Sequence, residues 1–340
     1  MNDGKMGGIW HWVEVESGRP TRASLEVAGK ARQLAASPGI QSEAVLVSPR
    51  GESLDGAMES LASHGVSHAL VLRAPGPFPG YSSALFTRAL CEATRRHSPE
   101  VLLLPASGDG MDLAPRVAAR LGTGLTAHCT DLALEPAGES WHLIQVVPGF
   151  GENLMVEIVC PERRPQMATV RPGVFPVPEP VEDASLSLLE EAVTAAPEDG
   201  LVEVLEVLPG EDEGADLEEA EVVVAGGWGM GCLGGLWPLE ELARLVGGVT
   251  GGTRPAVDKG WIPQDRMIGQ SGRSVRPHLF MSLGASGAMH FVTGFSGSRF
   301  IFSVTDDPRA PILRVSDVAV VADIREVLPA LLAGLRGLQG

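Results

Sequence analysis

The chain has 340 residues, of which 44% are hydrophobic, and it carries a formal net charge of −17 at pH 7. This length suits two domains of ordinary size, and the hydrophobic content can fill their cores. The excess of acidic residues excludes the basic surface that nucleic-acid binding requires, so we expect no nucleic-acid partner.

The acidic charge is concentrated in one segment. Residues 172–243 contain 18 Asp and Glu and no Lys or Arg, whereas the remainder has 25 acidic and 26 basic residues. We interpret the segment mainly as a solvated linker that keeps the protein soluble. Steering of a basic partner is the alternative.

The sequence indicates a cytoplasmic protein. Its N-terminus, MNDGKMGGIWHWVEV, has neither the apolar core of a signal peptide nor an Arg/Ser-rich presequence. Residues 222–239 are uncharged, but six are Gly and one is Pro, which favours a strand and a turn over a membrane-spanning helix. The cysteines form no Cys-x-x-Cys pair, and we expect them to be buried free thiols rather than metal ligands: Cys91, Cys129, Cys160 and Cys232.

The first 175 residues alternate between short apolar runs and segments of helical spacing. Strands are predicted at 9–15, 44–47, 69–72 and 101–104, and helices at 23–36, 54–62, 84–94 and 113–121. This alternation is typical of a parallel sheet with helices on both faces. The later runs at 132–134, 141–147 and 154–159 have no helices between them, so we expect extra antiparallel strands appended to that sheet.

Four prolines between 172 and 180 mark a domain boundary. We therefore predict an N-terminal α/β domain at 1–178, an acidic Pro/Ala/Glu-rich linker at 179–200, and a second α/β domain at 201–340. In the second domain we predict strands at 202–207, 221–225, 279–283, 300–304 and 318–321, and helices at 239–245, 288–292 and 324–335. Both domains are expected to be Rossmann-like, with largely parallel sheets.

Four turns of small or polar residues follow predicted strands or lie between them in the second domain. They are Gly226 to Gly231, Gly269 to Gly272, Gly284 to Ala288, and Thr305 with Asp306. Small residues let the backbone approach a phosphate or a flat polar ring, and open α/β sheets bind nucleotides beyond the carboxyl ends of their strands. A serine hydrolase is disfavoured, because Ser271, Ser286 and Ser296 each lack the second glycine of the nucleophile elbow.

Several long motifs make the chain resemble the α subunit of electron transfer flavoprotein. In the second domain they are Thr253-Arg254-Pro255-Ala256-Val257-Asp258, Ile268-Gly269-Gln270-Ser271-Gly272-Arg273, Gly284-Ala285-Ser286-Gly287-Ala288 and Val321-Ala322-Asp323. In the first domain the longest is Cys160-Pro161-Glu162-Arg163-Arg164-Pro165-Gln166-Met167-Ala168-Thr169-Val170-Arg171-Pro172-Gly173-Val174, which looks most like versions from anaerobic bacteria, some of which bifurcate electrons.

The resemblance implies an FAD held mainly by the second domain. It implies that Arg254 lies against the isoalloxazine ring, where its charge favours the anionic reduced forms. Ser271 is expected near flavin N5 with Gln270 alongside, and Asp323 near the adenosine half. Ser286, Gly287 and Ala288 are expected at the pyrophosphate. The remaining residues expected to line the cofactor are Thr253, Ile268, Gly269, Met289 and His290.

The resemblance also implies partners. A β subunit completes a heterodimer, an acyl-CoA or other flavin dehydrogenase donates electrons, and a quinone reductase or other flavoprotein accepts them, as in fatty acid β-oxidation. Such a chain is an electron carrier with no catalytic residues of its own, or else part of a bifurcating oxidoreductase complex. The sequence does not name the donor or acceptor, or say whether the β subunit holds AMP or a second FAD.

Three positions depart from the family pattern. Trp228 stands where the family usually has Arg, His290-Phe291 where it has Gln-His, and Thr305-Asp306 where it has Asn-Lys. These exchanges remove up to two positive charges near a diphosphate and add a negative one. They motivate an alternative function, that of a divergent paralogue with weak or lost FAD binding that acts as an interaction subunit.

Overall fold

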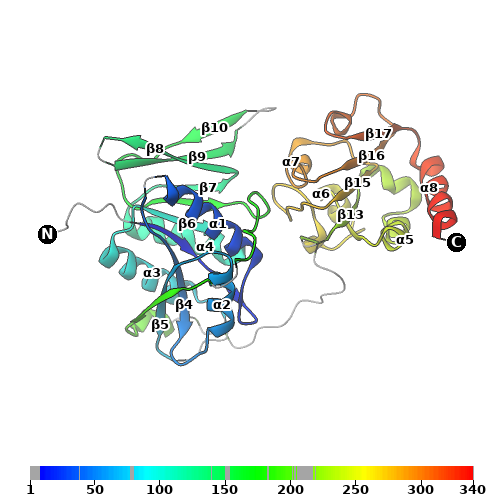
Figure 1. Cartoon of the computed structure of the whole chain (residues 1–340). Coiled ribbons are helices and arrows are strands. Elements are labelled where there is room, and N and C mark those ends of the chain that lie inside the picture. Colours follow the sequence, from blue (N-terminus) through cyan, green and yellow to red (C-terminus); the bar gives the residue numbers. More distant parts are fainter. Residues whose placement is uncertain are drawn as a thin grey trace. The chain divides into compact units, whose positions relative to one another are not determined.

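The computed structural model describes residues 8–37, 39–76, 80–138, 140–149, 154–181, 184–200, 202, 204, 217–218 and 220–339. The chain forms two compact units, Met1–Leu208 and Pro209–Gly340 (Figure 1). Within the described residues, no helix is long and apolar enough to cross a membrane.

The N-terminal unit is built on a seven-stranded parallel sheet with the order β12-β5-β4-β1-β6-β11-β7. Its strands are β1 (Ile9–Trp12), β4 (Ser42–Pro49), β5 (His68–Ala74), β6 (Val101–Pro105), β7 (Leu125–Cys129), β11 (Gln166–Val170) and β12 (Ser187–Ala192). Its helices are α1 (Arg22–Ala36), α2 (Asp55–Ser63), α3 (Ser83–His97), α4 (Gly108–Leu121) and the short 3-10 helix η1 (Pro197–Gly200).

Helices cover both faces of this sheet, as the alternation in the sequence predicts. Successive strand residues point to opposite faces. In β5, Leu70 belongs to a buried cluster with Leu90 of α3, whereas Val71 belongs to another with Leu61 of α2. The predicted α/β class and the doubly covered parallel sheet are confirmed.

The predicted antiparallel strands exist, but they form a sheet of their own. They are β8 (Asp131–Ala137), β9 (Ser140–Pro148) and β10 (Met155–Ile158), in the order β10-β9-β8. At the end of β7 the backbone of His128 takes a φ of 57°, which turns the chain before β8 begins. A small hairpin, β2 (Val15–Glu16) with β3 (Arg19–Pro20), adds a further antiparallel pair.

The expected linker at 179–200 differs from the structure. Strand β12 lies within it and pairs in parallel with β5 at the edge of the sheet. Ion pairs join the segment to the preceding domain, Glu190 with Arg73 at 2.6 Å and Asp199 with Arg88. Its acidic residues thus meet basic partners in the first unit, which the Ala- and Glu-rich composition did not reveal. The strand predicted at 202–207 lies outside the described residues, apart from 202 and 204.

The C-terminal unit has a five-stranded parallel sheet in the order β14-β13-β15-β16-β17. Its strands are β13 (Val222–Gly226), β14 (Val249–Gly252), β15 (Leu279–Leu283), β16 (Ile301–Thr305) and β17 (Val318–Val321). Its helices are α5 (Trp237–Val246), α6 (Arg254–Asp258), α7 (Met289–Val292) and α8 (Ile324–Gln339), with the 3-10 helices η2 (Trp228–Leu233), η3 (Gln264–Arg266) and η4 (Pro311–Arg314).

The order of the C-terminal strands reverses between β13 and β15. The chain passes from β13 to β14 on one side and then returns to β15 on the other. Loops that leave neighbouring strands at such a reversal part and open a crevice at the carboxyl edge. The first turns to examine for a ligand site are therefore those that follow Gly226 and Leu283.

Candidate functional site

The turns at the carboxyl edge of the C-terminal sheet are joined by backbone hydrogen bonds. The Gly229 amide donates to the carbonyl of Gly284 at 2.8 Å, and the Thr253 amide donates to that of Gly226 at 3.0 Å. A Cβ on Gly229 would lie 2.9 Å from the Cα of Gly284, so this contact requires glycine. The turns after β13, β14 and β15 thus form one continuous rim.

A cavity of about 560 Å³ opens on this rim. Trp228 and Trp261 line it near η2, and Thr305, Asp323 and Arg325 line it beyond β16 and β17. Trp228 and Thr305, two departures from the family pattern, are therefore both cavity residues. Asp323, predicted from the motif at 321–323, lines it too.

The charge in this cavity differs from what the sequence suggested. Lys259 and Arg325 both line it, so two basic side chains are present, and the acidic side chains of Asp306 and Asp323 line it as well. Arg325 Nε donates to Asp323 Oδ2 at 2.9 Å, and these hydrogen bonds lower the pKa of Asp323 to about 2. Asp323 is therefore ionised at neutral pH.

A second group of predicted residues lies on the loop between β14 and β15. The Ile268 amide bonds the carbonyl of Gly252 at 2.9 Å, and the Gln270 amide bonds the carbonyl of His290 at 2.7 Å. Gly269 has a φ of +141°, and a Cβ there would come within 2.6 Å of the His290 oxygen. The loop is thereby fixed between the end of β14 and α7.

The side chains of this loop and of α7 are accessible. Gln270, Ser271, Met289 and His290 are exposed, and the side chains of Gln270 and His290 are hydrogen-bonded to each other. Ile268, in contrast, is buried in the core. The structure thus brings four of the predicted cofactor residues together on one accessible surface.

Thr253 and Arg254 lie where β14 ends and α6 begins. The Arg254 side chain is 62% exposed, and its Nε lies 2.8 Å from Asp258 Oδ1. Thr253 Oγ1 is buried and has no hydrogen-bond partner among the described residues. Buried hydroxyls are normally paired, so this unpaired hydroxyl beside the rim is able to bind a ligand atom.

The turn Ser286-Gly287-Ala288 packs against η4. The Ile312 amide donates to the carbonyl of Ser286 at 3.0 Å, and a Cβ on Gly287 would lie 2.3 Å from the Ile312 nitrogen. Gly287 also has a φ of +79°, so glycine is required twice over. Ser286 and Ala288 remain exposed.

Phe291 is not part of the accessible surface. It is 6% exposed and packs against Phe280 and Phe295, with ring centroids 6.1 and 4.9 Å away. The position where the family usually has His is therefore a core position in this chain. His290 is the histidine that α7 presents to solvent.

The cavity residues that sequence reasoning missed include Lys259, Trp261 and Arg325. Lys259 and Trp261 come directly after the motif at 253–258, and that proximity was the available signal. Cys232 also lines the cavity and is exposed. The expectation of buried thiols is confirmed for Cys91 and Cys129, but it was wrong for Cys232 and for Cys160, which is half-buried.

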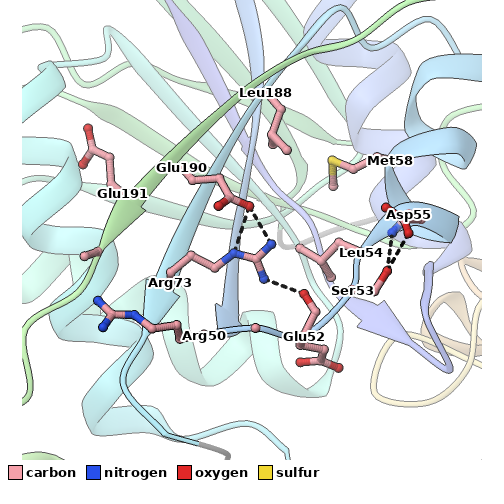
Figure 2. A pocket seen from close by; sticks show the side chains of 12 residues that line it. Arg50, Glu52, Ser53, Leu54, Asp55, Met58, Arg73, Leu188, Glu190 and Glu191 are labelled. Carbon is pink, nitrogen blue, oxygen red and sulfur yellow. Dashed lines mark hydrogen bonds and ion pairs between the residues drawn. The ribbon is translucent and has the colours of Figure 1, made fainter.

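A second cavity, of about 600 Å³, lies in the N-terminal unit at the carboxyl ends of β4 and β5 (Figure 2). Its central cation, Arg73, bonds Glu190 at 2.6 Å and the carbonyl of Glu52 at 2.8 Å, as the dashed lines show. The same guanidinium also bonds Ser48 and Pro49. Because these contacts hold Arg73 inside the fold, we assign it a structural role.

Comparisons with known proteins match both units. A family model described as "Electron transfer flavoprotein domain" matches residues 9–182, and one described as "Electron transfer flavoprotein FAD-binding domain" matches residues 216–296. "Protein FixB" of Clostridium saccharobutylicum is 38% identical over 98% of this chain and 97% of its own length. "Electron transfer flavoprotein subunit alpha" of Clostridium acetobutylicum is 38% identical over 99% of each chain.

A third relative carries a different name. "Lactate dehydrogenase (NAD(+),ferredoxin) subunit LctC" of Acetobacterium woodii is 36% identical over 97% of this chain and 77% of its own length. Proteins similar to this chain are therefore named for more than one electron-transfer system.

Proposed function

We propose a function from one premise: the chain belongs to the electron transfer flavoprotein family, as an α subunit that binds FAD. Its function is electron transport, for which FAD supplies a centre that accepts and releases electrons. In our proposal the chain pairs with a β subunit, receives electrons from a dehydrogenase and passes them to a quinone reductase or another flavoprotein.

The C-terminal unit fits an FAD at the carboxyl edge of its sheet. The unpaired hydroxyl of Thr253 supplies a hydrogen-bonding group, and the glycine-lined rim allows close backbone approach. The cavity adds two basic side chains that can meet a diphosphate, beside the acidic Asp306 and Asp323. The presence of Lys259 and Arg325 supports retained FAD binding over the alternative of a paralogue that has lost its cofactor. The convergence of the predicted residues on this one edge is the observation that carries the proposal.

The residues divide into three groups by position. We assign Arg254, Gln270, Ser271 and His290 to the ring end of FAD, where an exposed guanidinium favours added negative charge. Thr253, Ile268 and Gly269 form the floor between them. The rest line the diphosphate and adenosine end: Ser286, Gly287, Ala288, Met289, Thr305, Trp228 and Asp323.

The identity of the physiological electron donor depends on which dehydrogenase binds the heterodimer. The relative named as a subunit of a lactate dehydrogenase (NAD(+),ferredoxin) supports a donor other than an acyl-CoA dehydrogenase, and a donor of fatty acid β-oxidation stays a prediction from the resemblance. Both fit the same α-subunit site, because that site holds the cofactor and not the dehydrogenase substrate.

Co-expression with a β subunit tests the proposal. We expect a yellow heterodimer with flavin absorbance that is lost on removal of FAD and restored by titration, with a dissociation constant below the micromolar range. A colourless complex that takes up no added FAD would overturn the proposal and favour the interaction subunit.

A further inference from the structure

We propose that Trp228 is a stacking platform for the adenine ring and that Lys259 supplies the positive charge beside it, so that an aromatic–lysine pair takes the place of an arginine. The inference rests on the proposed FAD site. It assigns to the cavity a ligand of defined chemistry, a purine nucleoside diphosphate, which is one half of FAD.

The exposure of Trp228 is the first observation. This large ring is 60% exposed although it follows a buried glycine at the rim, and it forms a wall of the cavity. An indole in water at the edge of a polar cavity offers a flat apolar face. Any base can use such a face, because every base has a π surface.

Trp261 fixes the geometry. A Cβ on Gly231 would lie 2.8 Å from the Trp261 ring and one on Gly235 would lie 3.3 Å from it, so these glycines in and just after η2 allow this ring to pack closely. Its centroid lies 6.1 Å from that of Trp228 with the planes tilted by 39°. A base held between two parallel rings needs about 7 Å, or about 3.5 Å on each side. The base therefore stacks on the outer face of Trp228, and Trp261 supports the ring from beside it.

Lys259 provides the charge. Its Nζ lies 5.1 Å from the centroid of the Trp228 ring, within the range of a cation–π interaction. A base that stacks on the opposite face of Trp228 would extend its diphosphate past the edge of the ring toward this ammonium. Arg325 adds a second cation to the same cavity, but its guanidinium is already paired with the carboxylate of Asp323. Lys259 is thus the cation best placed to meet a diphosphate.

Calorimetric titration of the full chain with ADP, inorganic pyrophosphate and FAD separates the two contributions. Trp228→Ala should weaken ADP and FAD binding roughly tenfold or more, since stacking on an aromatic side chain contributes substantially to each base. It should leave pyrophosphate binding unchanged, and Trp228→Phe should restore most of the ADP affinity. Lys259→Met should weaken ADP and pyrophosphate alike. Trp237→Phe is the matched control, because Trp237 is 67% exposed in the same unit but does not line the cavity.

Alkylation of Cys232 gives a second readout that requires no flavin. This thiol is exposed on η2 within the cavity, so ADP should slow its modification in the wild-type chain and much less in Trp228→Ala. Modification of Cys160, which is not a cavity residue, should not respond to ADP.

The outcomes distinguish a failure of this inference from a failure of the proposed function on which it rests. If wild type and Trp228→Ala bind FAD and ADP equally well, the stacking platform is wrong while the flavoprotein function stands. If the wild-type heterodimer binds no FAD, the function itself fails. A parallel loss of ADP and pyrophosphate affinity in Trp228→Ala would also overturn the inference, because it would reflect damage to the whole cavity.

Discussion

The imidazole of His290 is hydrogen-bonded to the side chain of Gln270, with Nδ1 facing Oε1. An amide oxygen can only accept, so Nδ1 carries the proton in this hydrogen bond. The backbone amide of Gln270 also bonds the carbonyl of His290 at 2.7 Å. The loop at 268–273 and α7, separated by the whole of β15, are thereby locked to each other at the ring end of the proposed site.

Removal of this bond should loosen the ring end. We expect His290→Ala to weaken FAD binding about fivefold, the usual net effect of one hydrogen bond. Gln270→Ala breaks the same contact. The double variant should therefore bind FAD almost as tightly as the single variant with the lower FAD affinity. Titration of the four proteins with FAD measures this coupling, with Trp237→Phe as an exposed control that does not line the cavity. Strictly additive losses would show that the two side chains act separately.

Arg254 tests the electrostatic half of the proposal. Among the described residues, its side chain forms an exposed ion pair with Asp258 at 2.8 Å, and exposed pairs contribute little to stability. Arg254→Ala should therefore lower the flavin reduction potential while the unfolding midpoint stays nearly constant. Arg254→Lys keeps the positive charge, so it should lower the flavin reduction potential less than Arg254→Ala does. Redox titration of the heterodimer decides, and an unchanged potential in Arg254→Ala would place the guanidinium away from the ring.

The parallel sheets were predictable because short apolar runs alternate with amphipathic helices. Strand β14 was missed because its sequence, VTGG, contains two glycines and has little strand propensity. It forms through tertiary pairing with β13, from Val223 with Val249 to Gly226 with Gly252. The motif residues of the site were identified by resemblance, but that route could not add Lys259, whose role depends on the ring of Trp228 beside it.

Burial was equally hidden from sequence reasoning. The neighbours His290 and Phe291 both depart from the family pattern. His290 is exposed, whereas Phe291 is buried, with 6% of its surface exposed. Only the orientation of α7, a helix of four residues, separates them. Periodicity over so short a helix cannot fix which side faces the core.

The burial of Phe291 predicts that restoring the family histidine will not restore its function. Phe291→His places an imidazole among Phe280 and Phe295, where it loses apolar contacts and finds no polar partner in the aromatic cluster. We expect the free energy of unfolding of the C-terminal unit to fall by about 2–4 kcal/mol, with little change in flavin potential. Urea unfolding measures the loss, and Phe291→Leu should cost less. A stable variant with a raised potential would contradict the core assignment.

Glu14 makes the N-terminal unit sensitive to pH. Its carboxylate lies at the start of α4 and accepts hydrogen bonds from Ser107 Oγ and from the Gly110 amide, which is 3.1 Å away. Burial outweighs these bonds and raises the pKa of Glu14 from 4.5 to about 7. Between these two values the folded state therefore binds more protons than the unfolded state does.

Stability should consequently fall as pH rises from about 4.5 to about 7, by up to about 3 kcal/mol from this one group, and level off above that. Burial raises the pKa of Asp109 as well, which adds a decline of the same sign. Glu14→Gln removes the titrating proton while it keeps an acceptor for Gly110, so the free energy of unfolding should become flatter across this window. Denaturant unfolding at several pH values measures the slope, with the exposed Glu59→Gln on α2 as the control. An equally steep decline in Glu14→Gln would mean that another group carries the pH dependence and that Glu14 is ionised in the folded protein.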